Sequence, residues 1–405
     1  MADRVTEGRL VVDETSAVLV ITPTIPPPAL IAEETEPTSP GGRSSTGRRP
    51  GGESTVSADP AATRTPRAAY HHLLSRLADS LPDELLLNAR DWVAQGRLVD
   101  VAQAVGFAIA TGLCFPSEEE LALLRGTLLD AALDPTCLDQ AVGGKGSWWA
   151  LAPVGPAVLA ECRDRLAYSL DLTVPHDPDV GVDDLDTAAI VAARGRHNVA
   201  GLWRAWRFPA IDTPWPPPRR IYLLYIDVST DDQLAHIAAS VGRSLAPAST
   251  GPAPMVEVFT DVTQLPGYQR VALSAAALLW TREPSTPPLV AATANTPGDR
   301  PRQLDPALRE MVLSYLDGGI PLALPGAEAP EGQSPAGGPM GGWFTDGHWI
   351  WSTAISDRLR VHDEAPQDDL VRHISERDGI VPEVDPISLH RALSTLYGLP
   401  WLNPT

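Results

Sequence analysis

The chain has 405 residues, 43% of them hydrophobic and 20% charged, and a formal net charge of −20. These values are typical of a globular protein of two or three domains. The charge argues against nucleic-acid binding, because basic side chains supply most of the affinity for phosphate backbones and the densest basic group is Arg43, Arg48 and Arg49. We therefore expect no nucleic-acid partner.

Residues 1–65 are rich in Pro, Ser, Thr, Gly and Glu, a composition that buries too little apolar surface to offset chain entropy. We predict a disordered tail over 1–65. Two alternatives are a hairpin or docking strand formed by "RLVVDETSAVLVI" and a translation start further downstream. The apolar stretch 16–32 contains four prolines, so it predicts neither a signal peptide nor a membrane span.

Cysteine usage and residue bias indicate the cellular setting. Cys114, Cys137 and Cys162 are widely spaced and form no CxxC pair, which argues against a disulfide framework or a thiolate zinc site. Lys145 is the only lysine against thirty arginines, a bias typical of a GC-rich bacterial genome. We expect a bacterial, cytoplasmic protein with no membrane contact.

Residues 66–170 have the apolar spacing of short helices. The first stripe follows the i, i+3, i+4, i+7 pattern and consists of Tyr70, Leu73, Leu74 and Leu77. The next two segments end at Gly96 and Gly112, and a fourth begins with Ser117 and Glu120 at capping-box spacing. Short helices joined by brief turns predict an antiparallel helical domain over 66–170.

Residues 185–284 change to strand patterns. The segment 198–209 alternates, and "RRIYLLYIDV" (219–228) is a continuous apolar run typical of a strand buried on both faces. An amphipathic helix over 229–247 and a strand over 254–261 follow, which predicts a right-handed βαβ crossover in an α/β domain. The inward face of that helix is expected to hold Leu234, Ile237, Val241 and Leu245. Residues 272–280 fit either a strand or a buried helix.

Residues 303–405 predict a C-terminal module of a hairpin and helices. Asp305 and Pro306 start a helix that Gly318 ends, and "IPLALPG" is a short strand. Three helices are expected over about 353–362, 366–377 and 386–397.

The stretch "GGWFTDGHWIWSTAISDRL" (341–359) contains the predicted hairpin. Asp346-Gly347 is typical of a type I′ turn, in which Thr345 faces His348, Phe344 faces Trp349 and Trp343 faces Ile350. Tryptophan is usually buried, so we favour a packing role for the indoles of this hairpin. If exposed, they form a hot spot for a protein partner. That partner-binding hypothesis concerns Trp343, Trp349 and Trp351.

The same stretch resembles uncharacterised proteins of GC-rich bacteria, in which a TDG-x-W-x-W hairpin precedes helices. The resemblance is confined to this hairpin and the start of the following helix. It implies a structural module and no particular activity.

Three carboxylates follow the predicted central strand at the start of the next helix: Asp227, Asp231 and Asp232. Open α/β sheets bind ligands at the carboxyl ends of their strands, and carboxylates suit Mg²⁺. The structural alternative is that Asp231 and Asp232 stabilise the helix N-terminus while Asp227 ends the strand. His362 and His373, among neighbouring acids, are a further candidate metal site or pH-sensitive face, and the structural alternative is a solvated charged face.

The sequence thus predicts an α+β protein with a helical domain (66–170), a small βαβ-containing α/β domain (185–284) and a C-terminal hairpin-plus-helices module (303–405). It contains neither HExxH nor GxSxG, and we expect no cofactor. We interpret the chain as a non-catalytic intracellular protein-interaction protein, adaptor- or immunity-like, whose acidity suits a basic partner. The alternative hypothesis is an Mg²⁺-dependent enzyme near Asp227, Asp231 and Asp232.

Overall fold

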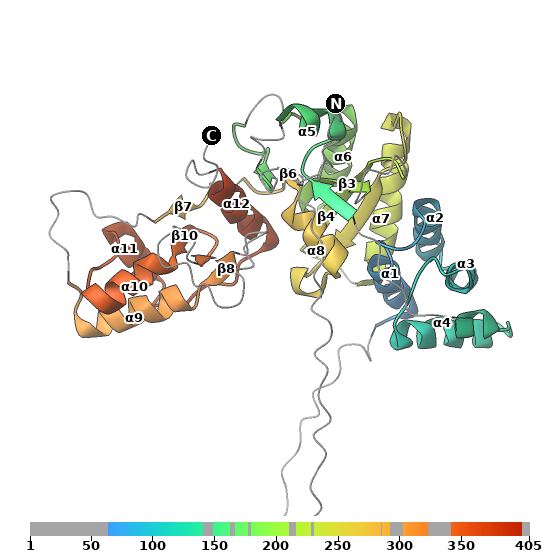
Figure 1. Cartoon of the computed structure of the whole chain (residues 1–405), viewed down its shortest axis with the longest axis horizontal. Coiled ribbons are helices and arrows are strands. Elements are labelled where there is room, and N and C mark those ends of the chain that lie inside the picture. The colour runs from blue at the N-terminus through green and yellow to red at the C-terminus, as the bar shows by residue number, and fades with distance from the viewer. Residues whose placement is uncertain are drawn as a thin grey trace, which may run out of the picture.

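A computed structural model describes residues 64–140, 149–162, 167–176, 180–209, 216–227, 231–284, 286–291, 303–322 and 342–398. All but the last two residues of the predicted 1–65 tail lie outside these ranges. The described chain is an α+β protein, as predicted. N-terminal helices cover one end of a mixed sheet, and a C-terminal module with its own small sheet lies at the other end (Figure 1).

The helices of the N-terminal part and central sheet are α1 (Pro66–Arg76), α2 (Asp83–Ala94), α3 (Leu98–Ala110), α4 (Glu118–Asp130), α5 (Pro156–Cys162), α6 (Asp184–Arg194), α7 (Asp231–Leu245) and α8 (Gly267–Ser274). The strands of the central sheet are β1 (Trp149–Ala152), β2 (Leu170–Asp171), β3 (Val199–Pro209), β4 (Arg219–Ile226), β5 (Met255–Phe259) and β6 (Ala277–Thr281). The C-terminal module consists of β7 (Leu289–Val290), α9 (Pro306–Asp317), β8 (Ile320–Leu322), β9 (Trp343–Thr345), β10 (Trp349–Ser352), α10 (Thr353–His362), α11 (Asp368–Glu376) and α12 (Pro386–Tyr397).

The central sheet has the order β2-β6-β3-β4-β5, and β1 pairs with β3 beside β6. The strands β4 and β5 are parallel and joined by α7, so the predicted βαβ connection is confirmed. The four apolar residues expected on the inner face of α7 are all buried. Residues 272–280 combine both predicted alternatives, because α8 ends at Ser274 and β6 begins at Ala277.

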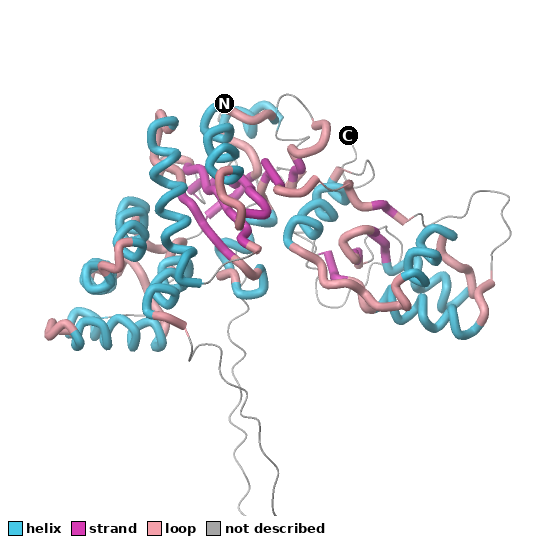
Figure 2. The backbone as a smooth tube through the Cα atoms, turned by 180° about the vertical axis from the view of Figure 1, so that it is seen from behind, coloured by secondary structure: helices cyan, strands magenta, loops and turns pink. Residues whose placement is uncertain are grey.

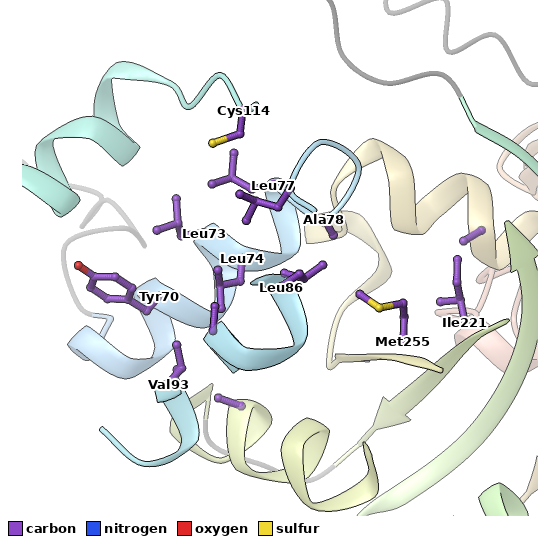
Figure 3. Packing of buried hydrophobic residues seen from close by; sticks show 14 of the residues in the cluster. Tyr70, Leu73, Leu74, Leu77, Ala78, Leu86, Val93, Cys114, Ile221 and Met255 are labelled. Atoms are coloured by element: carbon purple, nitrogen blue, oxygen red, sulfur yellow. The ribbon is translucent and has the colours of Figure 1, made fainter. Parts of the chain in front are cut away.

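The helices α1 to α4 share one hydrophobic core with the central sheet. In Figure 3, Leu74 and Leu86 lie between α1 and α2, and Ile221 and Met255 approach the same cluster from β4 and β5. A buried ion pair adds a polar link, since Arg90 of α2 contacts Glu257 of β5 at 2.5 Å. The N-terminal helices and the sheet are therefore packed as one body, which we call the N-terminal body.

The helix α12 joins the C-terminal module to the N-terminal body and lies between them in Figures 1 and 2. On one side, His390 contacts the Leu170 carbonyl at 2.9 Å and Arg391 donates to Asp171 at 3.0 Å. On the other side, Ala392 and Leu396 pack in a cluster with residues of the small sheet. One helix thus carries most of the connection between the two parts.

In the part of the chain that the structure describes, no helix combines the length and the apolar character that crossing a bilayer requires.

Candidate functional site

The predicted hairpin forms, but its register differs from the prediction. Ile350 pairs with Thr345 and Trp351 with Phe344, so four residues rather than two lie between the first paired residues. Gly347 has the positive φ expected of a turn glycine, at +83°, whereas Asp346 is not among the residues with positive φ. A type I′ turn needs positive φ at both positions, so its prediction here was wrong.

Side-chain hydrogen bonds explain this wider turn. An oxygen of Asp346 accepts from the backbone amides of His348, at 2.8 Å, and Trp349, at 2.6 Å. The Thr345 hydroxyl accepts from the Gly347 amide and donates to the Trp349 carbonyl. These bonds close the loop locally, in the manner of an Asx turn.

The second oxygen of Asp346 is the centre of a buried polar network. The Tyr315 hydroxyl of α9 donates to it at 2.6 Å, and His373 Nε2 of α11 contacts it at 2.6 Å. The other ring nitrogen of His373 accepts from Arg377 at 3.0 Å, and the exposed His348 ring stacks on His373 with centroids 5.0 Å apart. The hairpin, α9 and α11 thus meet at one carboxylate.

The charges in this network are set by burial and hydrogen bonding. Burial alone would raise the pKa of Asp346, but hydrogen bonds from Tyr315, two backbone amides and His373 bring it below its ordinary value. Burial and the nearby Arg377 lower the pKa of His373. A neutral His373 then donates through Nε2 to an ionised Asp346 and accepts through Nδ1 from Arg377. Neither ring nitrogen is left to move a proton to or from a substrate, so the network is suited to holding three elements together.

The three indoles of the partner-binding hypothesis are buried: Trp343 is 5% exposed, Trp349 4% and Trp351 0%. Trp349 and Trp351 pack against α9 to α11, and Trp343 packs with Ile350 against α12. Trp351 Nε1 also donates to the Leu316 carbonyl at 3.1 Å. Their location is that of the packing alternative.

The carboxylates of the magnesium hypothesis have protein partners where they are described. Asp227 forms an ion pair with Arg282, and Asp232 accepts from the Thr65 hydroxyl. The side chain of Asp231 lies outside the described residues. His373 points to Asp346 rather than to the acids near His362. Among the residues with assigned positions, no group of three or more His, Cys, Asp or Glu side chains is arranged to hold a metal ion.

The helices α3 and α4 carry a surface that the sequence patterns did not indicate. Phe107 on α3 is 67% exposed and Leu113, just after α3, is 47% exposed. Phe107 is the one aromatic residue among the large hydrophobic side chains that the described ranges leave exposed. Glu118 and Glu119, both exposed, follow at the start of α4.

The backbone at the end of α3 places Leu113 directly after the glycine that ends the helix. The Leu113 amide donates to the Ala108 carbonyl at 2.8 Å and the Gly112 amide to the Ile109 carbonyl at 2.9 Å, with Gly112 at φ +72°. These bonds form a Schellman motif. In this motif the residue after the glycine, here Leu113, commonly contacts a residue in the last turn of the helix, the position that Phe107 occupies in α3. We call Phe107, Leu113, Glu118 and Glu119 the α3–α4 surface.

The charge around the α3–α4 surface is strongly negative. Residues 98–139 contain seven acidic residues and one arginine, a net charge of −6 out of −20 for the whole chain. Three of the seven acids are in ion pairs: Asp139 with Arg125 at 2.7 Å, Asp100 with Arg97 at 2.7 Å and Glu120 with Arg76 at 2.6 Å. The helices α3 and α4 are also the outermost of the N-terminal helices in Figures 1 and 2.

Comparison with known proteins found no matching family model, no matching curated protein and no matching solved structure.

Proposed function

We propose that this chain is a protein-interaction protein that binds a basic partner through the α3–α4 surface. The observation that carries the proposal is the exposure of Phe107 and Leu113, together with that of Glu118 and Glu119 at the start of the next helix. Isolated exposed apolar residues are common on proteins, but aromatic anchors within a polar rim are typical of contact surfaces.

The chemistry of the surface sets the kind of partner. Burying a side chain such as Phe107 or Leu113 in an interface stabilises the complex by roughly 1.5–3 kcal/mol. The surrounding acids favour arginine and lysine on the partner and speed association at low ionic strength. A basic segment with an apolar centre satisfies both requirements. The proposed partner is therefore a basic protein with an apolar contact residue.

A capture experiment with matched variants tests this proposal. The immobilised chain is exposed to extract of the native cell as wild type, as Phe107→Ser/Leu113→Ser, and as the control Val361→Ser/Ile380→Ser. Val361 and Ile380 are each 70% exposed but belong to the C-terminal module. We expect wild type and control to retain the same basic protein, the double variant at Phe107 and Leu113 to lose it, and added salt to weaken its binding. Equal retention by all three chains would contradict the proposal.

The magnesium-dependent alternative is separated by thermal unfolding with and without Mg²⁺. A specific ion raises the melting temperature through its binding free energy. If the chain is an interaction protein, we expect its melting temperature to be the same with Mg²⁺ and with a monovalent salt of matched ionic strength. A Mg²⁺-specific rise that Asp231→Asn abolishes would favour the enzyme instead.

A further inference from the structure

A cavity of about 340 Å³ lies between β2 with its following segment and the last turn of α12. One wall includes Leu170, Leu172 and Val174, and the other includes Ser394, Thr395 and Gly398. This volume falls within the range of sites that hold small ligands or a few side chains. Neither the hairpin network nor the α3–α4 surface involves this cavity.

The polar groups at the cavity wall indicate a neutral occupant. Asp171 lies at the wall, but one of its oxygens accepts from Arg391 and the other from the amide and hydroxyl of Thr173. The Nδ1 of His176, a second wall residue, contacts the Val174 carbonyl at 2.8 Å. Because the charge of Asp171 is already compensated, the wall offers apolar surface and the hydroxyls of Ser394 and Thr395.

The position of Gly398 indicates which apolar segment can reach the cavity. Gly398 lines the cavity and is the last residue that the structure describes. It is followed by Leu-Pro-Trp-Leu-Asn-Pro-Thr, residues 399–405, which contain no charged side chain. An extended chain spans up to about 3.6 Å per residue. Because the segment begins at the rim of the cavity, each of its residues can reach the cavity.

We infer that this cavity binds the chain's own C-terminal segment, residues 399–405, with Trp401 as the apolar anchor. The tether places the segment at an effective concentration in the millimolar range, so weak intrinsic affinity suffices for occupancy. Pro400 and Pro404 reduce the conformational freedom that docking removes. The inference does not depend on the proposed function, because it concerns a different part of the molecule.

The test measures binding of a fluorescein-labelled LPWLNPT peptide to the full chain and to a chain that ends at Gly398. We expect saturable binding to the shortened chain and binding at least about tenfold weaker to the full chain, whose cavity is occupied. The same peptide with Trp401→Ala is expected to lose about tenfold in affinity for the shortened chain.

A matched pair of variants places the binding at this cavity. In the shortened chain, Ser394→Tyr fills the cavity from α12 and is expected to abolish peptide binding. Ser244→Tyr, on an exposed position of α7, is expected to leave it unchanged. Circular dichroism checks that both variants fold, and the Trp401→Ala peptide tests the inference independently of either.

Three results would overturn the inference. The first is equal binding of the peptide to the full and shortened chains. The second is no saturable binding to the shortened chain at millimolar peptide. The third is a full-length dimer that becomes monomeric on shortening, because the segment would then bind a second copy.

Discussion

The two ends of the central sheet are covered in different ways. At one end, α1 to α4 share a continuous apolar core with β3, β4 and β5, reinforced by the buried pair of Arg90 and Glu257. At the other end, the C-terminal module is connected mainly through α12, where His390 and Arg391 contribute hydrogen bonds at the joint. We therefore expect the N-terminal body to unfold as one unit, and the C-terminal module to be the part that a local change can release.

The largest expected effect tests the N-terminal side of this comparison. Replacing Arg90 by alanine leaves Glu257, which is 3% exposed, without its cationic partner. Removing one member of a buried pair costs about 3–5 kcal/mol. We expect a loss of that size in the free energy of unfolding, measured by urea denaturation. Arg97→Ala, which breaks an exposed pair with Asp100, is the control and is expected to cost less than about 1 kcal/mol.

Acid is expected to act next most strongly, through buried neutral histidines. Burial, with Arg90 nearby, lowers the pKa of His71 from 6.5 to about 4. A depressed histidine pKa means that the unfolded chain binds the proton more readily. The contribution of neutral His71 to the free energy of unfolding is therefore complete above about pH 6.5, and it is lost as the pH falls from 6.5 to about 4. The loss amounts to about 3 kcal/mol for His71.

The check is the pH dependence of the unfolding free energy in wild type and His71→Gln. The variant should have a smaller slope between pH 6.5 and 4. The pKa of His390, at the joint, and that of His373, in the C-terminal module, are also lowered by burial, so some slope remains. An unchanged slope in the variant would show that His71 is protonated equally easily in both states.

A change at the joint should have a smaller and more local effect. Arg391→Ala removes the cation from Asp171, but Asp171 keeps its hydrogen bonds from Thr173. We expect a loss of about 2 kcal/mol, typical of a hydrogen bond to a charged group. Hydrogen exchange should increase in α12 and the C-terminal module while α1 and α2 stay protected. Equal deprotection of both parts would mean that they unfold together.

The smallest effects concern the outer helices of the N-terminal body. Gly112, at φ +72°, has no neighbouring atom within 4 Å of the position that an alanine Cβ would take, so Gly112→Ala introduces backbone strain alone and should cost about 1 kcal/mol. Ala132 holds the same position after α4 at φ +57°, so Ala132→Gly should stabilise by about 0.5 kcal/mol. Because α3 and α4 share the core of the N-terminal body, we expect both changes to shift the main unfolding transition of that body. If the two changes alter only the local hydrogen exchange of α3 and α4, these two helices unfold separately from the rest of the N-terminal body.

Local signals predicted much of this fold. The capping box at Ser117 and Glu120 forms as expected, and the apolar run of 219–228 becomes the inner strand β4. The predicted short strand at Ile320 also forms, and the structure shows that it pairs with the hairpin strand β9. These features depend on residues a few positions apart, which a single sequence contains.

The candidate sites depended on information that the sequence does not display. Asp346 fits a turn, and nothing in the spacing links it to Tyr315 or His373, which lie 31 and 27 residues away. Its side chain binds backbone amides, which set the wider turn. Phe107 was missed for a different reason: α3, "LVDVAQAVGFAIA", is apolar on nearly every side, so its pattern does not show which side faces solvent.

The central functional claim is that the α3–α4 surface contacts a basic partner, and site-specific photo-crosslinking in the native cell tests it most directly. A photoreactive residue is placed at Phe107 in one chain and at Val361, in the C-terminal module, in another. We predict one discrete crosslinked product with a basic protein from position 107, reduced by Glu118→Gln/Glu119→Gln, and none of that product from position 361. No product from position 107, or the same product from both positions, would contradict the claim.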